Sequence, residues 1–230
     1  MPFPGGDRLW PAPEVEIFYD EDGAWRCPPD IDPGDWSMSA SGRGVDLEQN
    51  VRGAAFRRSI RAGSVATDLP YCAYRVDDEV SSTEGWSAWH LVMAPAPARV
   101  FVLADKEPVT YYAPAPEFDD GWTLATGKDR WKVGFPPNDD GRVLMAAIGV
   151  DDPGGLVAVV STAPADGMYV DVPPDGGDPT AIQVYDDGEA GFCELEHHAP
   201  VGAASSALVV GAWGSASERR RLIQVLSENS

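Results

Sequence analysis

The segment GFCELEHHAP (Gly191–Pro200) alternates apolar with polar side chains, which is typical of a β-strand, here one late in the chain. Side chains two positions apart on a strand lie on the same face. The alternation predicts one face with two carboxylates and an imidazole, made of Phe192, Glu194, Glu196 and His198. The other face would carry Cys193, Leu195 and His197. Such a paired acidic face is either the wet surface of a sheet or the floor of a cleft where a carboxylate transfers protons.

The rest of the chain repeats this pattern of short strands. Clusters of Gly, Pro, Asn and Asp, which tolerate hairpin conformations, separate the apolar or alternating runs. We expect strands over residues 15–19, 56–61, 69–76, 86–93, 100–103, 109–112, 131–134, 142–148, 156–161, 168–172, 181–185, 191–197 and 207–210. The pattern predicts an all-β fold, an antiparallel β-sandwich that forms a single domain over residues 1–230, with a short C-terminal helix at 218–226 capped by Ser217.

The charge and the cysteine content of the chain argue against some classes of binding partner and cellular compartment. The chain has 37 Asp and Glu against 17 Lys and Arg, and its net charge of -20 repels phosphate backbones and anionic lipids. We therefore expect no nucleic acid and no membrane as partners. The three cysteines are far apart and fit neither a disulfide framework nor a metal site, and the N-terminus lacks a signal sequence, so we expect a cytoplasmic protein.

Motifs for cofactors are absent from the sequence. GxGxxG and GxxxxGK[ST], the fingerprints of dinucleotide and phosphate binding, do not occur. The chain has three histidines and no spaced set of Cys, His and carboxylate residues. His197 and His198 are adjacent on the predicted strand and point to opposite faces, so we expect them at the surface rather than in a shared metal site. The sequence predicts neither a cofactor nor a metal.

Four segments together resemble a known family. GGDRLWPAPE (5–14), GWSAWHLV (85–92), RWKVGF (130–135) and FCELEHHAP (192–200) resemble, in that order, the landmarks of the galactose mutarotase-like superfamily, and most closely its DUF4380-type branch. The resemblance extends from Gly5 to about Ala212. It implies a large antiparallel β-supersandwich that binds a small-molecule sugar on its concave face. Many members of the superfamily interconvert the anomers of an aldose.

The resemblance also implies roles for individual residues. The late-strand glutamate that acts as the base in aldose 1-epimerases matches Glu196, which would take the proton of the anomeric hydroxyl while an acid protonates the ring oxygen. A neighbouring Glu194 and an apolar surrounding would raise the pKa of Glu196. The H-x-Y-F-N motif that carries the acid in the family is absent, and His90 is the mid-chain histidine that could replace it.

Further residues could line the sugar site. Side chains that could stack on a sugar ring or bond its hydroxyls are Arg8, Trp10, Trp131, Lys132, Tyr169, Asp171, Glu194 and His198. Tryptophans in a sandwich either pack in the core or stack on sugars, and we expect one or two at a groove from the set Trp10, Trp86, Trp89 and Trp131. In GWSAWHLV, alternation groups His90 with Trp86, Ala88 and Val92 on the face proposed to meet the sugar.

Two hypotheses about the function stay open. One is a cofactor-free aldose 1-epimerase, and the other is a carbohydrate-binding or structural β-sandwich that lacks the chemistry. A glycosidase is disfavoured, because carboxylates two apart on one strand flank a bond poorly. Members of the superfamily usually carry more strands before the first motif, whereas four residues precede Gly5 here. Either the start is trimmed, or an exposed sheet edge is covered by the tail or by a second chain, which predicts a homodimer.

Overall fold

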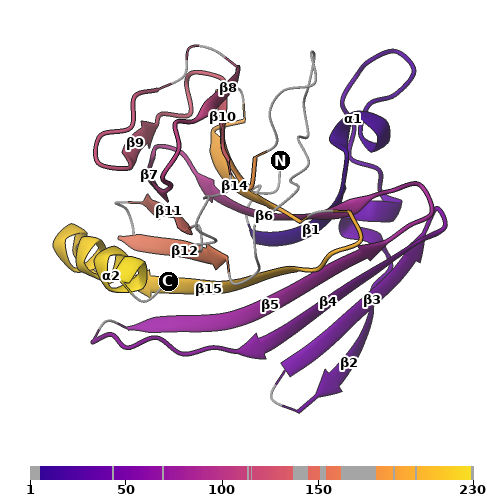
Figure 1. Cartoon of the computed structure of the whole chain (residues 1–230), viewed down its shortest axis with the longest axis horizontal. Coiled ribbons are helices and arrows are strands. Elements are labelled where there is room, and N and C mark those ends of the chain that lie inside the picture. The colour runs from indigo at the N-terminus through magenta and orange to yellow at the C-terminus, as the bar shows by residue number, and fades with distance from the viewer. Residues whose placement is uncertain are drawn as a thin grey trace.

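The fold consists of two antiparallel β-sheets and a few short helices (Figure 1). The computed structural model describes residues 6–42, 44–68, 70–112, 114, 116–136, 145–150, 154–161, 180–188, 190–199 and 201–228. The six-stranded sheet has the order β1 (Gly6–Ala12), β6 (Ser87–Pro95), β14 (Phe192–His198), β13 (Ile182–Asp187), β10 (Trp131–Phe135) and β8 (Val109–Tyr112). The prediction of an all-β antiparallel sandwich is confirmed.

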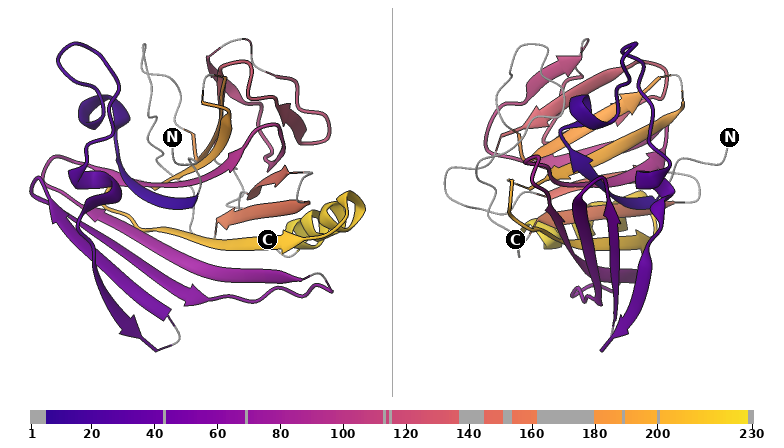
Figure 2. Two further views of the ribbon diagram at one scale, coloured as in Figure 1. Left: turned by 180° about the vertical axis from the view of Figure 1, so that it is seen from behind. Right: turned by 90° about the vertical axis from the view of Figure 1, so that its right-hand side faces the viewer.

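The nine-stranded sheet is the larger layer. Its order is β2 (Ser37–Ser41), β3 (Gly44–Val51), β4 (Ala54–Ala62), β5 (Tyr71–Ser81), β15 (Ser205–Trp213), β12 (Gly155–Ser161), β11 (Met145–Val150), β7 (Ala98–Leu103) and β9 (Trp122–Ala125). Figure 2 shows its strands β2 to β5 running beyond the smaller sheet. The predicted strand at 168–172 and residues 142–144 of another lie outside the described residues.

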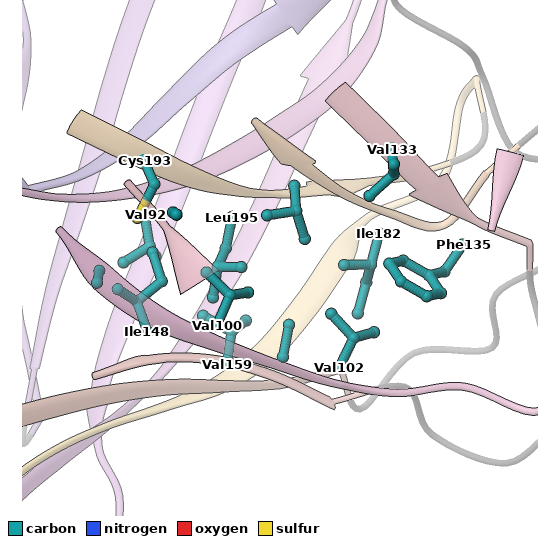
Figure 3. Packing of buried hydrophobic residues seen from close by; sticks show 14 of the residues in the cluster. Val92, Val100, Val102, Val133, Phe135, Ile148, Val159, Ile182, Cys193 and Leu195 are labelled. Atoms are coloured by element: carbon teal, nitrogen blue, oxygen red, sulfur yellow. The ribbon is translucent and has the colours of Figure 1, made fainter. Parts of the chain in front are cut away.

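The main core lies between the two sheets (Figure 3). The six-stranded sheet contributes Val92, Val133, Ile182 and Leu195, and the other sheet contributes Val100, Ile148 and Val159. Each of these side chains is at most 5% exposed. Burial of a branched aliphatic side chain of this kind stabilises a fold by about 1.5–3 kcal/mol. This packing fixes which face of the smaller sheet points away from the core.

A second cluster closes the β1 end of the sandwich. Trp10 and Trp89 of the smaller sheet pack there with Phe18, Ile31 and Phe56. Phe18 directly follows α1 (Glu14–Ile17), and Ile31 lies in the irregular turn η1 (Asp30–Gly34). The predicted strand at 15–19 is therefore wrong: extended Pro13 starts a helical turn whose first residues carry carboxylates. Acidic side chains in the first turn of a helix interact favourably with the positive end of the helix dipole.

The C-terminal helix α2 (Ala216–Glu228) is present where the sequence predicts one. Its buried side chains Leu222, Ile223 and Leu226 pack on β11, β12 and β15. The cap is Ser215 rather than Ser217: its hydroxyl accepts from the backbone N–H of Glu218 at 3.4 Å, while the Glu218 carboxylate accepts from the Ser215 N–H at 2.8 Å. Among the described residues, no helix is long and apolar enough to cross a membrane.

Candidate functional site

A pocket of about 550 Å³ opens on the face of the six-stranded sheet that points away from the core. Its wall combines aromatic rings with charged side chains. The aromatic lining residues are Trp10, Tyr19, Trp25, Trp89, Tyr112, Tyr185 and Phe192. The charged lining residues are Arg8, Glu14, Asp32, Arg130, Lys132, Asp187 and Glu194. Its size is in the range of small-molecule sites.

Strand register explains why these residues meet. Lys132 pairs with Tyr185, Tyr185 with Glu194, and Glu194 with Met93, so one row crosses four strands. Paired residues in a sheet share a face, and residues two apart on a strand share it too. Glu196 and His198 therefore lie on the same face as Glu194, as the alternation in Gly191–Pro200 predicts.

Glu196 lies beneath the pocket in a cluster of charges. It is 1% exposed, and its two carboxylate oxygens lie 2.9 and 3.0 Å from the Nζ of Lys132. The Nε2 of His198 lies 3.6 Å from Glu196 Oε2. Burial alone would raise the pKa of Glu196, but Lys132 and His198 hold it below its ordinary value. The expected upward shift of this pKa is therefore wrong, because the dominant neighbour is a cation rather than Glu194.

Glu194 occupies a different position from Glu196 although both share a face. Glu194 is 7% exposed and lines the pocket, as does Lys132. Glu196 does not contribute to the pocket wall. The pair predicted from the sequence is thus divided into an upper carboxylate that borders the pocket and a lower one that holds the Lys132 ammonium.

Aromatic side chains build the β1 side of the pocket. Trp10 packs edge-on against Trp89 with ring centroids 5.4 Å apart, and Phe18 stacks on Trp25 at 5.9 Å. Trp89 in turn stacks on His198 at 5.7 Å. The buried Nε1 of Trp89 and both ring nitrogens of His198 have no hydrogen-bond partner within the described part of the chain. Buried polar atoms of this kind are unusual and call for a ligand or a water molecule.

Residues 13–36 form one wall of the pocket and are tied to β1. Arg8 forms an ion pair with Asp32, whose carboxylate also accepts from the Trp10 indole N–H at 3.1 Å. The indole N–H of Trp25 donates to Glu14 at 2.6 Å. These contacts hold the aromatic side chains of this segment over the sheet.

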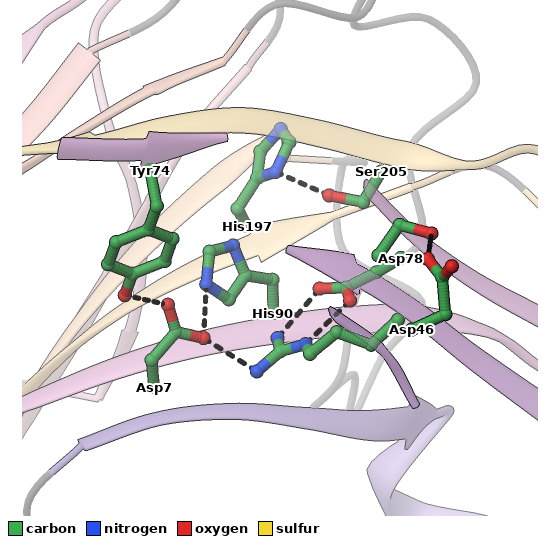
Figure 4. Close-up of polar contacts among 9 residues, drawn as sticks. Asp7, Asp46, Tyr74, Asp78, His90, His197 and Ser205 are labelled. Carbon is green, nitrogen blue, oxygen red and sulfur yellow. Dashed lines mark hydrogen bonds and ion pairs between the residues drawn. The ribbon is translucent and has the colours of Figure 1, made fainter. Parts of the chain in front are cut away.

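His90 does not belong to this site. It pairs with His197 across β6 and β14, on the face opposite Glu196. There its Nε2 lies 2.8 Å from Asp7, which also binds Arg58 at 2.8 Å and accepts from Tyr74 (Figure 4). Arg58 in turn makes two 2.7 Å contacts with Asp78. The expectation that His90 and Val92 form a sugar-facing surface is wrong, because this face of β6 packs into the molecule.

The remaining predicted residues divide between pocket and core. Arg8, Trp10, Lys132 and Glu194 line the pocket, and His198 lies beneath it. Trp131 is 3% exposed and packs between the sheets, and Trp86 packs in the second cluster. His197 and His198 are 5% and 1% exposed, so the prediction of surface positions is wrong. Tyr169 and Asp171 lie outside the described residues.

Several pocket residues are absent from the sequence predictions. They are Glu14, Trp25, Asp32, Tyr112, Arg130, Tyr185 and Asp187. Tyr185 could have been found from the sequence, because it lies on the predicted strand 181–185. It pairs with Glu194 and therefore shares the pocket face. Trp25 and Asp32 lie in a loop whose path the alternation rules do not describe. Within the described residues, no group of three or more His, Cys, Asp or Glu side chains is arranged to hold a metal ion.

Comparison with known proteins gives likenesses of fold. No family model matches the sequence, and no curated protein matches it. A candidate aldose 1-epimerase from Klebsiella pneumoniae subsp. pneumoniae MGH 78578 is 9% identical with a TM-score of 0.39, over 81% of this chain and 59% of that one. A galactose mutarotase-like protein from Clostridium acetobutylicum is 8% identical with a TM-score of 0.31, over 91% of this chain and 79% of that one. The chain thus spans 59% of the length of the first protein.

Proposed function

We propose that the pocket on the six-stranded sheet binds a carbohydrate. The observation that carries this proposal is the Trp89 side chain, which lines the pocket, is 2% exposed and has an indole N–H without an acceptor among the described residues. A sugar offers an apolar ring face for stacking and hydroxyl oxygens that accept such an N–H. A purely apolar ligand would leave that N–H unmet.

The composition of the wall supports the same ligand class. Trp25 is 44% exposed and provides ring surface beside the buried Trp10 and Trp89, while Arg8, Lys132 and Glu194 provide donors and acceptors for hydroxyl groups. Predominantly aromatic pockets with a few placed polar groups are typical of small-molecule sites. Of the four tryptophans considered from the sequence, Trp10 and Trp89 line the pocket, and this supports the expectation of one or two at a groove.

Calorimetric titration with a panel of aldoses tests this proposal. Trp25→Ala removes a ring that lines the pocket and is 44% exposed, so the fold should tolerate the change. We expect about a fivefold to tenfold loss of affinity, the amount that one aromatic contact contributes. Trp213→Ala is the matched control, because Trp213 is 50% exposed at the end of β15 and does not line the pocket. Absence of binding to every sugar by the folded protein would contradict the proposal.

Anomer interconversion is the second candidate function. The observation that favours it is that Glu194 and Lys132 both border the pocket, so that a carboxylate and an ammonium can act on one ligand. Glu194 would take the proton of the anomeric hydroxyl, and Lys132 would protonate the ring oxygen as the ring opens. Glu196, the base implied by the family resemblance, would instead keep Lys132 charged and oriented, since it lies 2.9 Å from that ammonium.

NMR exchange spectroscopy distinguishes the two glutamates. If Glu194 is the base, Glu194→Gln should abolish acceleration of anomer exchange, whereas Glu196→Gln should reduce it and shift its pH profile. If Glu196 is the base, Glu196→Gln alone should abolish the acceleration. No acceleration by the wild-type protein for any sugar that binds would leave a binding role without catalysis.

The homodimer expected from the sequence stays a prediction. The nine-stranded sheet ends at β2 (Ser37–Ser41), whose residues 37–40 are exposed and include Met38 at 72%. An edge strand without charged side chains or proline is open to pairing with another strand. Light scattering after size exclusion would test the dimer, and Met38→Lys should dissociate it.

A further inference from the structure

Arg130 lies at the end of the pocket formed by β8, β10 and β13, and the proposed function gives it no role. Its guanidinium lies 4.9 Å from the ring centroid of Tyr112 and 5.9 Å from that of Tyr185. Its Nε donates to the Tyr185 hydroxyl at 3.1 Å. The residue is exposed and lines the pocket, so a ligand can reach it.

The other two pocket cations are already paired with carboxylates. Arg8 binds Asp32, and Lys132 binds Glu196. No ion pair within 4 Å links Arg130 to a carboxylate in the part of the chain that the structure describes. In a chain with 37 acidic and 17 basic residues, a pocket cation without a close carboxylate is unexpected from charge alone.

The nearest acid at this end is Asp187, and it is engaged elsewhere. Its Oδ2 accepts from the Tyr185 hydroxyl at 3.2 Å, and its Oδ1 accepts from the backbone N–H of Ala190 at 2.9 Å. The Tyr185 hydroxyl therefore lies between Arg130 and Asp187. This arrangement holds Arg130 in place without a direct ion pair.

The geometry also orients the guanidinium. Two tyrosine rings and one hydrogen bond at Nε restrict a side chain that is otherwise flexible. The two terminal amino groups then form the free fork that binds a carboxylate through two parallel hydrogen bonds. A neutral hydroxymethyl group cannot use both arms of this fork in the same way.

We propose that the pocket prefers sugar acids, with the carboxylate of a uronic acid bound by Arg130 and the ring against the tryptophans. This inference rests on the proposed carbohydrate function and specifies its substrate class. Arg130 is assigned as a specificity-determining binding residue, and no chemical step is assigned to it. The acidic side chains Glu14, Asp32, Asp187 and Glu194 line the pocket as well, so the carboxylate of the ligand is placed at the guanidinium of Arg130.

Calorimetry with matched ligands tests the preference. Glucuronate and galacturonate are compared with glucose and galactose, and the methyl esters of the two uronates keep the shape without the charge. We expect each uronate to bind about tenfold or more tightly than its aldose or its ester, as charge-assisted bonds allow. In Arg130→Gln the ratio of uronate affinity to aldose affinity should fall to near one. Arg57→Gln, a change at an exposed arginine outside the pocket, should leave that ratio unchanged.

The outcomes separate the two proposals. Aldoses that bind as tightly as uronates would overturn the sugar-acid preference and leave carbohydrate binding intact. A uronate preference that persists in Arg130→Gln would overturn the assignment of Arg130. If neither uronates nor aldoses bind the folded wild-type protein, the proposed function falls, and this inference falls with it.

Discussion

The two faces of strands β6 and β14 carry similar polar residues, but these residues have different roles on each face. On the core face, His90, Asp7, Arg58 and Asp78 form a chain of contacts between 2.7 and 2.8 Å. On the pocket face, Glu196 and Lys132 are paired, but Trp89 Nε1 and His198 Nδ1 lack hydrogen-bond partners within the described residues. On the core face, His90 Nδ1 is also buried without a hydrogen-bond partner among the described residues.

This difference distinguishes a structural polar network from a binding surface. A buried network whose groups satisfy one another fixes the packing of two sheets. A face that keeps unmet donors beside aromatic rings is suited to a ligand that meets them. A histidine and a carboxylate on adjacent strands are therefore not evidence of a site until their faces are known.

The largest expected effect comes from breaking the core network. Arg58→Leu removes the 6% exposed cation between Asp7 and Asp78 and leaves both carboxylates without it. Loss of one partner from a buried ion pair destabilises a fold by about 3–5 kcal/mol. Urea unfolding followed by circular dichroism should show a loss of this size, or no folded protein at all.

Arg57→Leu is the control for that experiment. Arg57 is the preceding residue on β4 and has an exposed side chain that lies 3.6 Å from Glu48 and from Glu79. Exposed pairs contribute about 0–1 kcal/mol. If the two variants lost equal stability, the core network would not have the structural role assigned to it.

The next largest effect concerns the pair beneath the pocket. Lys132→Met leaves Glu196 buried without its cation and should destabilise the fold by roughly 3 kcal/mol. The double variant with Glu196→Gln should recover part of this loss, because the uncompensated charge is gone. A double-mutant cycle on the free energy of unfolding measures the coupling. Additive losses would show that Lys132 and Glu196 are not coupled.

The sequence predicted the faces of β14 but not of β6. In Gly191–Pro200 the alternation alone groups Glu194, Glu196 and His198, and the register confirms it. In β6 the residues from Ser87 to Met93 are all buried, so polarity could not tell the pocket face from the core face. Only pairing with β1 and β14 puts His90 opposite His197 and away from Glu196.

Other errors follow from contacts distant in sequence. The pKa of Glu196 depends on Lys132, which is 64 positions away in sequence, and pairing through β13 brings the two side chains together. Strands β2 and β3 were missed because their runs, SMSAS and GVDLEQNV, have few of the β-branched and aromatic residues typical of strands. The pairing of β3 with β4, and of β2 with β3, supplies what local propensity lacks.

The smallest expected effect, compared over one pH unit, is a pH dependence of stability that arises on the core face. His197 accepts or donates a hydrogen bond with Ser205 at 2.8 Å, and burial, with His90 and His198 nearby, lowers its pKa to about 3 from 6.5. Between these values the unfolded chain binds a proton that the folded protein does not. Stability due to His197 is thus complete above pH 6.5 and is lost as the pH falls toward 3, by at most about 1.4 kcal/mol per unit.

His197→Asn tests this pH dependence against the wild type. The variant should lose stability less steeply between pH 6.5 and 4.5, whatever its stability at pH 7. The low pKa values of Asp7 and Glu196 have the same sign but act below that window, because unfolded carboxylates titrate near 3.8 and 4.5. Equal slopes for variant and wild type would mean that His197 takes up a proton in the folded state, and the packed core face would then tolerate a buried charge.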